Sequence, residues 1–579
     1  MAHEIPRDIQ DRIAVWQQKV EDKDLKAELS ELLGKGDVAS ITDAFYRDLA
    51  FGTAGLRGII GPGTNRMNIY TVGQATQGLA QYLTKHYEKP SVMMVRDSRH
   101  MGEEFTKRAA SILAANGVEV IVAPRIEPVP LLSFATRYLG CSAGIAITAS
   151  HNPAVYNGYK VYGPDGCQIA HEAASEIQHA IDTTDAFGSV LISDFDEKLQ
   201  KGRIRYMDDA VIDAYLDAIE KVSHPGCITP NLRVVYTPLN GTGLECVTRI
   251  LERIGLKNIT VVPEQEKPDG DFPTCPYPNP EIQEALKKGL ELAKETGADL
   301  LLATDPDADR VGIAVPHSNT YHLLSGNEVG ALLIAWLSEL SPQDERARKV
   351  CISTIVSSDM PDELAHAYGF EMRRTLTGFK YLGEQIDLLE QAGEANRFLL
   401  AFEESYGYLA GTHARDKDAV VTSMLIAEMA GWYAERGMDL YEAMDRLYQT
   451  YGYLMNGVVN VTFEGAAGSE KMESIMCNLR QAPPQDIAGF AVTKIVDYNA
   501  GAPMPTVNAR PGEQTQKLPL ANVLEFQLEG KNKVIVRPSG TEPKIKAYLF
   551  ARANTREASQ EIIDKLSFAV KNHLFGEQE

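Results

Sequence analysis

Apolar and polar residues follow one another along the chain in a pattern that predicts strands alternating with helices. Short apolar runs at residues 91–95, 118–122 and 143–147 predict buried strands. Between the first two, residues 103–115 have the spacing of an amphipathic helix and end before Gly117, and a second helix is expected near 129–139. Because strands joined by helices form parallel sheets covered on both faces, this region predicts an α/β domain.

The same plan recurs twice further along the chain. The second region predicts strands at residues 232–236, 259–262 and 299–303, with helices at 244–254 and 280–296. The third predicts helices at residues 327–340, 361–368 and 379–389, with strands at 350–355 and 398–401. The sequence therefore predicts an α/β fold built from three similar units.

The C-terminal region has a different pattern. Residues 523–528 and 533–536 alternate like antiparallel strands around Gly530, residues 544–550 alternate again, and residues 555–574 predict a closing helix. This indicates a smaller α+β domain, whereas the Gly-, Pro- and Ala-rich stretch at 464–513 predicts mobile loops. We expect four domains, at residues 1–205, 206–323, 324–455 and 456–579.

Composition narrows the classes of function. With 579 residues the chain is too long for a single core. Its net charge of −22 disfavours nucleic acid, whose binding depends on cationic side chains that neutralise phosphates. The longest apolar run, residues 329–337, is far shorter than the roughly 20 residues that span a membrane. The absence of a leader-like apolar segment at residues 1–19 and an odd number of cysteines predict a cytoplasmic protein.

A serine motif follows the predicted strand at 143–147. The sequence Thr-Ala-Ser-His-Asn-Pro at 148–153 places Ser150 at the carboxyl end of that strand, where α/β proteins bind ligands. The same residues could instead form a turn in which the Thr, Ser and Asn side chains bond to nearby amides. The motif alone does not separate the two interpretations.

Three aspartates follow the predicted strand at 299–303. Asp305, Asp307 and Asp309 are spaced two residues apart, so an extended segment would point their carboxylates the same way. Converging negative charges favour a bound cation, and oxygen ligands without His or Cys favour Mg²⁺ over zinc. A solvated acidic turn is the alternative. Because the chain as a whole is anionic, it would repel an anionic substrate unless a metal ion, arginines or lysines gathered in the binding cleft.

A candidate phosphate-binding loop follows the predicted strand at 533–536. In Arg-Pro-Ser-Gly-Thr-Glu-Pro-Lys at 537–544, Gly540 lets amides and hydroxyls converge while Arg537 can bind two oxygens. An ordinary Pro/Gly turn is the alternative. Residues 52–58 and 96–100 add arginines near strand ends, and Glu403 and Ser405 suit hydroxyl recognition. No Walker-type phosphate loop or hydrolase-type serine elbow is present.

Four motifs, each after a predicted strand, occur in this order along the chain: 148–153, 305–310, 403–405 and 537–541. Together they resemble the α-D-phosphohexomutase family, the phosphoglucomutases and phosphomannomutases. The opening around residues 49–58 is similar to the branch that contains bacterial phosphoglucomutases and phosphopentomutases. The resemblance covers nearly the whole chain. It implies four domains, of which the first three share an α/β core.

The resemblance also implies roles for particular residues. Ser150 would carry a phosphoryl group and would bind Mg²⁺ together with Asp305, Asp307 and Asp309. The implied catalytic neighbours of Ser150 are Arg57, His151 and Lys417, the last as a general acid or base. The implied substrate contacts are Arg310, Lys380, Glu403, Ser405, Arg537, Ser539, Gly540 and Thr541.

By this resemblance the reaction interconverts glucose 1-phosphate and glucose 6-phosphate through a bound glucose 1,6-bisphosphate. Phosphomannomutase and phosphopentomutase activities stay open as alternatives, as do a serine phosphohydrolase and a non-catalytic sugar-phosphate sensor. Two departures from the family pattern matter. Phe402 stands where many members have glycine, and Tyr406-Gly407 replaces the Gly-His of many phosphomannomutases.

Overall fold

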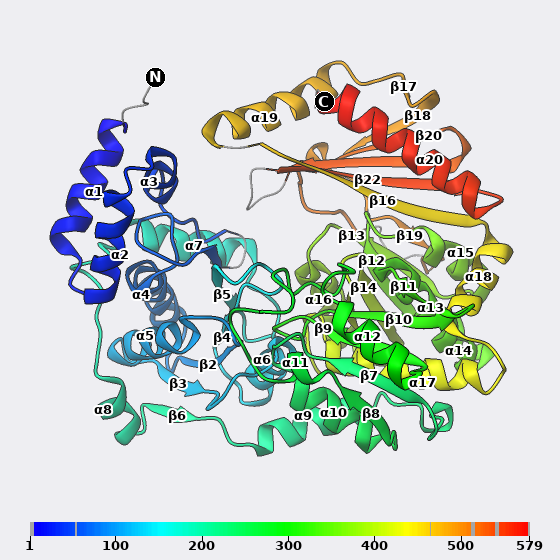
Figure 1. Cartoon of the computed structure of the whole chain (residues 1–579), viewed down its shortest axis with the longest axis horizontal. Coiled ribbons are helices and arrows are strands. Elements are labelled where there is room, and N and C mark those ends of the chain that lie inside the picture. Colours follow the sequence, from blue (N-terminus) through cyan, green and yellow to red (C-terminus); the bar gives the residue numbers. More distant parts are fainter. Residues whose placement is uncertain (1–4, 53–54, 464, 511–515, 539–543, 577–579) are drawn as a thin grey trace. The chain divides into compact units, whose positions relative to one another are not determined.

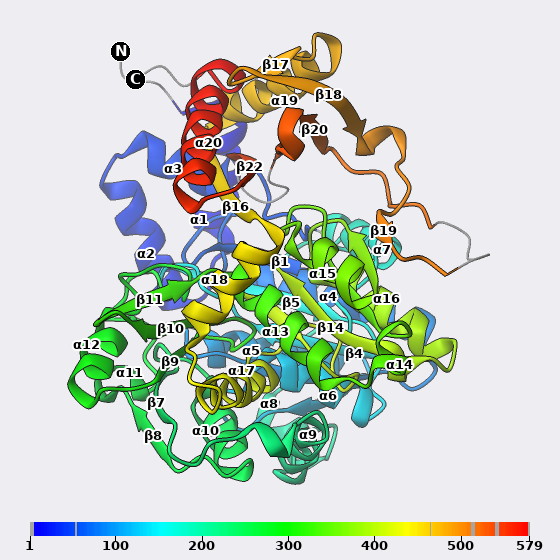
Figure 2. The same ribbon diagram turned by 90° about the vertical axis from the view of Figure 1, so that its right-hand side faces the viewer.

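A computed structural model describes residues 5–52, 55–463, 465–510, 516–538 and 544–576. It contains two compact units. The first unit comprises Met1–Ala314 and Gly407–Glu428, and the second comprises Val315–Tyr406 and Met429–Glu579. Figures 1 and 2 label the helices and strands of both.

The first unit begins with short helices around an aromatic cluster. These are α1 (Arg7–Lys19), α2 (Lys23–Gly34) and α3 (Val38–Phe45). Trp16 contacts the rings of Phe45 and Tyr70 edge-on, and all three side chains are buried. Burial of these rings anchors the N-terminal helices to the domain that follows.

The first sheet has a parallel centre and an antiparallel edge. Its order is β1 (Gly55–Ile59), β5 (Tyr156–Tyr162), β4 (Ala143–Ile147), β2 (Ser91–Arg96), β3 (Glu119–Val122) and β6 (Ile204–Tyr206). The strands β4, β2, β3 and β6 run parallel, whereas β5 and β1 are antiparallel to their neighbours. Its helices are α4 (Ile69–His86), α5 (Gly102–Ala115), α6 (Val129–Tyr138), α7 (His171–Asp182) and α8 (Phe195–Gln200).

The second sheet follows the same plan. Here β8 (Asn258–Val261), β7 (Arg233–Thr237) and β9 (Leu300–Thr304) are parallel, and β10 (Val311–His317) is antiparallel to β9. Its helices are α9 (Ala210–Glu220), α10 (Gly243–Arg253), α11 (Pro263–Glu266) and α12 (Lys287–Thr296). The predicted helix at 280–296 is therefore wrong over its first half, where residues 279–286 form consecutive turns instead.

The second unit contains a third sheet with parallel strands. In it β14 (Phe398–Glu403), β12 (Val350–Thr354) and β13 (Glu371–Thr375) are parallel, and β19 (Thr506–Val507) adds to β13 antiparallel. The helices are α13 (Gly326–Leu340), α14 (Gln343–Arg346), α15 (Met360–Tyr368) and α16 (Phe379–Gln391). β11 (Thr320–Leu324) precedes α13, and β15 (Gly407–Leu409) and α17 (Ala419–Ala434) follow β14 in the chain.

The C-terminal part of the second unit is an antiparallel sheet. Its order is β16 (Tyr453–Thr462), β22 (Lys544–Ala553), β21 (Lys533–Pro538), β20 (Leu524–Leu528), β18 (Phe490–Asp497) and β17 (Asp486–Ile487). The helices α19 (Gly465–Gln481) and α20 (Arg556–Ala569) pack on it, and α18 (Leu440–Tyr451) precedes it (Figure 1). The predicted fold class, α/β units followed by an α+β domain, is confirmed.

The predicted loops at 464–513 are wrong in part, because this stretch contains α19, β17 and β18. Met472, Ile475, Met476 and Leu479 have helical spacing and are buried against the sheet. The small residues that flank this apolar stripe hid it in the average composition. Among the described residues, none of the helices is long and apolar enough to cross a lipid bilayer.

Candidate active site

Ser150 lies in a tight loop that leaves the carboxyl end of β4, as predicted. The loop turns because Ser150 has a left-handed backbone, with φ of 54°. Thr148 Oγ1 accepts a hydrogen bond from the Ser150 amide at 2.8 Å, so the capped-turn interpretation holds for Thr148. The Ser150 hydroxyl is instead directed at a carboxylate, since its Oγ donates to Asp305 Oδ2 at 2.8 Å.

The aspartate loop converges through a turn and not through the extended segment that was predicted. Ala308 has φ of 51°, and Asp305 Oδ1 accepts hydrogen bonds from the amides of Asp309 and Arg310. The turn buries Asp305, Asp307 and Asp309 and brings one oxygen of each within 4.8 Å of the others. Their carboxylates do converge, and a solvated acidic turn is excluded by their burial.

Two lysines supply positive charge to the buried aspartates. Lys160 on β5 places its Nζ 2.7 Å from Asp307 Oδ2 and 3.6 Å from Asp309 Oδ2. Lys417 Nζ lies 3.2 Å from Asp309 Oδ2. Buried carboxylates of this density need such partners, because an isolated ion loses its hydration on burial.

The aspartates respond to this environment in opposite directions. Burial, followed by repulsion from Asp307 and Asp309, raises the pKa of Asp305 well above its ordinary value. Burial also disfavours the charged form of Asp307. The positive charge and hydrogen bond of Lys160 exceed this effect, so the pKa of Asp307 is lowered to about 2. The cluster therefore holds a fixed negative charge at Asp307 and a more easily protonated carboxyl at Asp305.

The same cluster fits a divalent cation. Asp307 Oδ1 and Asp309 Oδ1 are buried and have no hydrogen-bond partner among the described residues. Buried acceptors are almost always satisfied, so two orphaned oxygens in one cluster indicate a missing partner. The ligand atoms are carboxylate oxygens without sulfur or imidazole, the set that suits hard cations.

Lys417 is held in place by a buried hydrogen-bond network. Its Nζ donates to Asp416 Oδ1 at 2.9 Å. The other carboxylate oxygen of Asp416 accepts from the Tyr162 hydroxyl at 2.8 Å and from Gln168 Nε2 at 3.3 Å. The predicted Lys417 thus belongs to the same site as the aspartates, positioned by β5 and the residues after it.

His151 and the two predicted arginines also lie around the serine loop. His151 Nδ1 is 3.2 Å from Ser150 Oγ. Burial, then the positive charges of Arg310 and Arg57, lower the pKa of His151 well below its ordinary value, which keeps the imidazole neutral. Arg57 Nη1 donates to Asn152 Oδ1 at 3.3 Å, so its guanidinium is joined to the loop.

Arg310 extends from the aspartate turn and is partly exposed. Its Nη1 forms an ion pair with Glu281 Oε1 at 2.7 Å, and its Nε lies 3.7 Å from Asp309 Oδ1. A partly exposed guanidinium with a carboxylate partner can exchange that partner for an anionic ligand at modest cost.

The remaining predicted residues belong to the second unit. Glu403 ends β14, and its Oε1 accepts a hydrogen bond from the Gly378 amide at 2.8 Å. Arg537 is the penultimate residue of β21, and its Nη1 donates to Thr377 Oγ1. The loop at 377–378 therefore connects Glu403 to Arg537, so these two predicted substrate contacts share one local site.

Lys380 and Ser405 lie near this loop in the sequence, and both are half-buried. The Lys380 ammonium is 5.1 Å from the Tyr381 ring centroid. Ser405 lies in the turn that follows β14. Ser539, Gly540 and Thr541, predicted to grip phosphate, lie outside the described residues.

Phe402 adopts ordinary strand geometry, although many family members have glycine there. It pairs with Ser353 inside the third sheet and is fully buried. Its ring occupies the space beside Gly330 of α13, where an added Cβ would come within 2.6 Å of ring atoms. Gly330 thereby leaves room for the Phe402 ring.

Lys160 was not predicted from the sequence as a residue of this site. The available sequence signal was a single lysine within the buried strand β5. It lies four residues after the start of the strand and ten residues after Ser150. A cation inside an otherwise buried strand needs a buried anion. The anion lies in the aspartate loop, far away in sequence.

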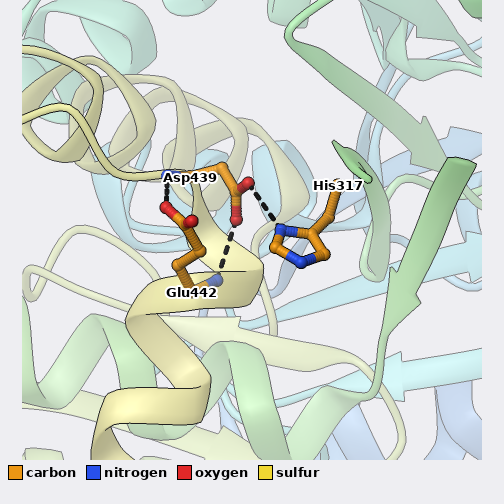
Figure 3. A group of neighbouring side chains, drawn as sticks. All are labelled: His317, Asp439 and Glu442. Carbon is orange, nitrogen blue, oxygen red and sulfur yellow. Dashed lines mark hydrogen bonds and ion pairs between the residues drawn. The ribbon is translucent and has the colours of Figure 1, made fainter. Parts of the chain in front are cut away.

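A second group of potential ligands occurs in the second unit. His317, Asp439 and Glu442 bring their ligand atoms within 4.8 Å of one another (Figure 3). Asp439 caps α18 by accepting from the Glu442 amide at 2.8 Å, and Glu442 accepts from the Asp439 amide at 3.3 Å. His317 Nδ1 lies 3.0 Å from Asp439 Oδ2. A reciprocal helix cap explains this group without a metal.

Comparison with known proteins bears on the function of both sites. Models of the phosphoglucomutase/phosphomannomutase family match as α/β/α domain I at residues 48–187, domain II at 213–318 and domain III at 325–451. A phosphoglucomutase of Staphylococcus saprophyticus is 37% identical over 502 residues, covering 86% of this chain and 90% of that protein. One of Staphylococcus haemolyticus is 35% identical, covering 92% and 95%.

Solved structures show the same fold. The open form of parafusin, a phosphoglucomutase from Paramecium, is similar with a TM-score of 0.70 at 18% identity, covering 92% of this chain and 97% of that one. A family protein from Burkholderia thailandensis has a TM-score of 0.64 at 19% identity, covering 90% and 96%. The chain therefore belongs to the phosphoglucomutase/phosphomannomutase family of enzymes, as the resemblance of its motifs indicated.

Proposed function

We propose that this enzyme is a Mg²⁺-dependent phosphoglucomutase that interconverts glucose 1-phosphate and glucose 6-phosphate. The observation that carries the proposal is the contact of Ser150 Oγ with Asp305 in a buried cluster of carboxylates that has orphaned oxygens. The names of the Staphylococcus relatives support glucose as the sugar. Mannose and pentose phosphates remain alternatives by the same mechanism.

In this proposal Ser150 carries a phosphoryl group between turnovers. The P–Oγ bond breaks as a sugar hydroxyl oxygen bonds to phosphorus, and the proton of that hydroxyl passes through an acid/base group to the departing Ser150 Oγ, which becomes a hydroxyl again. Because such transfers have a loose, in-line transition state, positioning and charge supply most of the catalysis. A Mg²⁺ ion held by Asp305, Asp307 and Asp309 would stabilise the charge on the transferring group.

The cations around Ser150 have distinct parts in this scheme. Lys417 is the candidate general acid or base, because Asp416 and Asp309 fix its ammonium beside the cluster. His151, whose lowered pKa keeps it neutral, can form a hydrogen bond beside Ser150 Oγ. Arg57, Arg310 and Lys160 offset phosphate charge, which the net charge of the whole chain would otherwise repel.

The site in the second unit suits recognition of the rest of the substrate. Glu403, Ser405 and Lys380 would bond sugar hydroxyls. Arg537 would bind the phosphate that does not react, with Ser539, Gly540 and Thr541. After the first transfer the substrate is glucose 1,6-bisphosphate, which must turn end for end so that its other phosphate reaches Ser150 Oγ. A separate phosphate grip lets either end bind while limiting escape.

The test uses intact-mass analysis with peptide mapping. The wild-type protein, incubated with glucose 1,6-bisphosphate, should gain one phosphoryl group on Ser150 and then convert glucose 1-phosphate. Ser150→Ala should gain none and lose turnover without loss of fold, while Ser175→Ala, at an exposed helical serine, should behave like the wild type.

Other results would change the proposal. Release of inorganic phosphate without isomerisation would point to a phosphohydrolase, and binding without turnover would point to a sugar-phosphate sensor. The ratio of kcat/KM for glucose, mannose and ribose 1-phosphates decides the sugar. The free cysteines within the described residues fit the reducing cytoplasm that we propose as its compartment.

A further inference from the structure

Arg99 is a charged residue whose side chain is completely buried. It follows β2 in the segment 96–100, which adds arginines near a strand end. The side chains of both Arg99 and Asp97 have no exposed surface. A buried guanidinium is retained only where protein acceptors replace its hydration, so the partners of Arg99 reveal its role.

The Arg99 guanidinium binds the backbone of the Ser150 loop. Nη2 donates to the carbonyl oxygens of Ser150, at 2.6 Å, and of Asn152. Nη1 donates to those of Pro153, at 2.9 Å, and Tyr156, at 3.0 Å. One side chain thereby gathers carbonyl groups from the whole stretch between β4 and β5.

Asp97 orients the guanidinium from the other side. Its Oδ2 lies 3.2 Å from Arg99 Nε, and its Oδ1 accepts a hydrogen bond from the Arg99 amide at 2.9 Å. Carbonyl oxygens thus accept from both Nη groups while the Asp97 carboxylate supplies a negative charge beside Nε, an arrangement that a planar guanidinium fits and a single ammonium does not.

A segment of the second sheet's domain covers the back of this arrangement. The Phe272 ring centroid is 5.1 Å from Arg99 Cζ, and Phe272 is fully buried with φ of 47°. Gly270 lies against the backbone of Ser98 and His100, where a Cβ would approach His100 N to 2.9 Å. A strained aromatic residue and an obligatory glycine therefore fix the base on which Arg99 rests.

We propose that Arg99 is a positioning residue that holds Ser150 Oγ in line with the aspartate cluster. The left-handed conformation of Ser150 directs its hydroxyl to Asp305, and Arg99 binds the carbonyl of that same residue. Arg99 acts through backbone groups and touches no substrate. This role rests on the proposed function, because the reacting group it aligns is the phosphoryl carrier.

The test compares Arg99→Lys with a matched variant, Arg397→Lys. Arg397 is also buried and bonds to Glu371, Glu394 and the Arg348 carbonyl within the third sheet's domain, just before β14 and at the opposite end of that strand from Glu403. Both variants should lose thermal stability. Only Arg99→Lys should lower kcat, by about 100-fold, because an ångström of misplacement has that effect, with KM for glucose 1-phosphate unchanged.

Hydrogen exchange gives a readout that does not depend on activity. In Arg99→Lys, amides of residues 149–157 should exchange faster, whereas other segments keep wild-type rates and Arg397→Lys leaves this peptide protected. Arg99→Met, which removes the charge as well, should show a larger effect in both measurements. If Arg99→Met does not fold, Arg99→Lys alone carries the test.

Two outcomes overturn the inference. One is wild-type kcat and wild-type exchange in folded Arg99→Lys, and the other is an equal loss of kcat in both arginine variants. If wild-type protein takes no phosphoryl group from glucose 1,6-bisphosphate, the proposed function fails instead. The exchange measurement on residues 149–157 still reports whether Arg99 holds the loop in that case.

Discussion

The two groups of potential metal ligands found among the described residues are both closely clustered, but their surroundings are opposite. Both bring three ligand atoms within 4.8 Å. Asp305, Asp307 and Asp309 are buried, whereas the side chains of His317 and Asp439 keep 27% and 30% of their surface exposed. Two aspartate oxygens near the lysines have no hydrogen-bond partner among the described residues. In the other group, the Asp439 oxygens instead cap α18 and contact His317.

This difference shows that proximity alone does not identify a metal site. Exposed carboxylates at a helix N-terminus come together because each satisfies an amide that the helix leaves unpaired. Buried carboxylates that come together without enough donors store electrostatic cost, which a cation relieves. Unsatisfied acceptors and nearby counter-charges are therefore the informative features.

The largest expected effect is on the buried group. Asp307→Asn should abolish tight Mg²⁺ binding and lower kcat at least 10³-fold, because the ion supplies several kcal/mol of charge stabilisation. Calorimetric titration with Mg²⁺ and steady-state rates measure both. Asp439→Asn, which keeps a capping side chain, should match the wild type in each. Equal Mg²⁺ affinity in the two variants would remove the distinction between the groups.

A second test removes a counter-charge. Lys160→Met leaves Asp307 buried without its closest cation, so unfolding in the presence of EDTA should require about 3–5 kcal/mol less. Chemical denaturation measures this, and added Mg²⁺ should restore more stability to the variant than to the wild type. Lys565→Met breaks an exposed pair with Glu561 and should cost about 0.5 kcal/mol or less. An equally small loss for Lys160→Met would show that the aspartates need no lysine.

A buried carboxyl outside both groups shows what happens without nearby lysines. Burial raises the pKa of Glu127 to about 8, although Arg125 Nε lies 3.2 Å away. The unfolded chain releases this proton near pH 4.5 and the folded chain near 8, so the folded state loses stability as pH rises between them.

Glu127→Gln should therefore be more stable than the wild type by a few kcal/mol above pH 8, with the advantage vanishing below pH 4.5. Urea unfolding at a series of pH values checks this. A pH-independent difference would mean that Glu127 is ionised in the folded protein throughout.

The smallest effect is expected at the exposed group. Asp439→Ala removes the cap of α18 and should lower the free energy of unfolding by about 1 kcal/mol. Thermal unfolding checks the loss, and kcat should stay at its wild-type value with or without added divalent cations. A change in the Mg²⁺ dependence of the rate would give this group a role beyond capping.

The sequence predicted the positions of the main motifs because each follows an apolar strand. Ser150 after β4 and the aspartates after β9 were found in this way, since local hydrophobic runs determine both strands. The turn at Ala308 was not predicted, because the left-handed conformation of a non-glycine residue has no local sequence signature. The boundaries predicted for the four domains stay a prediction.

Long-range partners account for the other misses. The strand β13 reads Glu-Met-Arg-Arg-Thr, too charged for a buried strand, and it is buried because Glu371 pairs with Arg397 and Arg374 pairs with Asp362. Arg99 and Lys160 were hidden for the same reason: their acceptors are brought close only by tertiary folding. A single sequence does not specify such pairs.

Because lysines lie beside the aspartates, we expect folding of this protein to depend less on divalent cations than its activity does. The lysine ammonium groups already offset part of the buried charge, so we expect a newly made chain to reach its native shape in a cell that is short of divalent cations. In zinc fingers, by contrast, the metal supplies the folding energy itself. We expect cellular Mg²⁺ to govern how many copies work at a given moment, while the number of copies present stays the same.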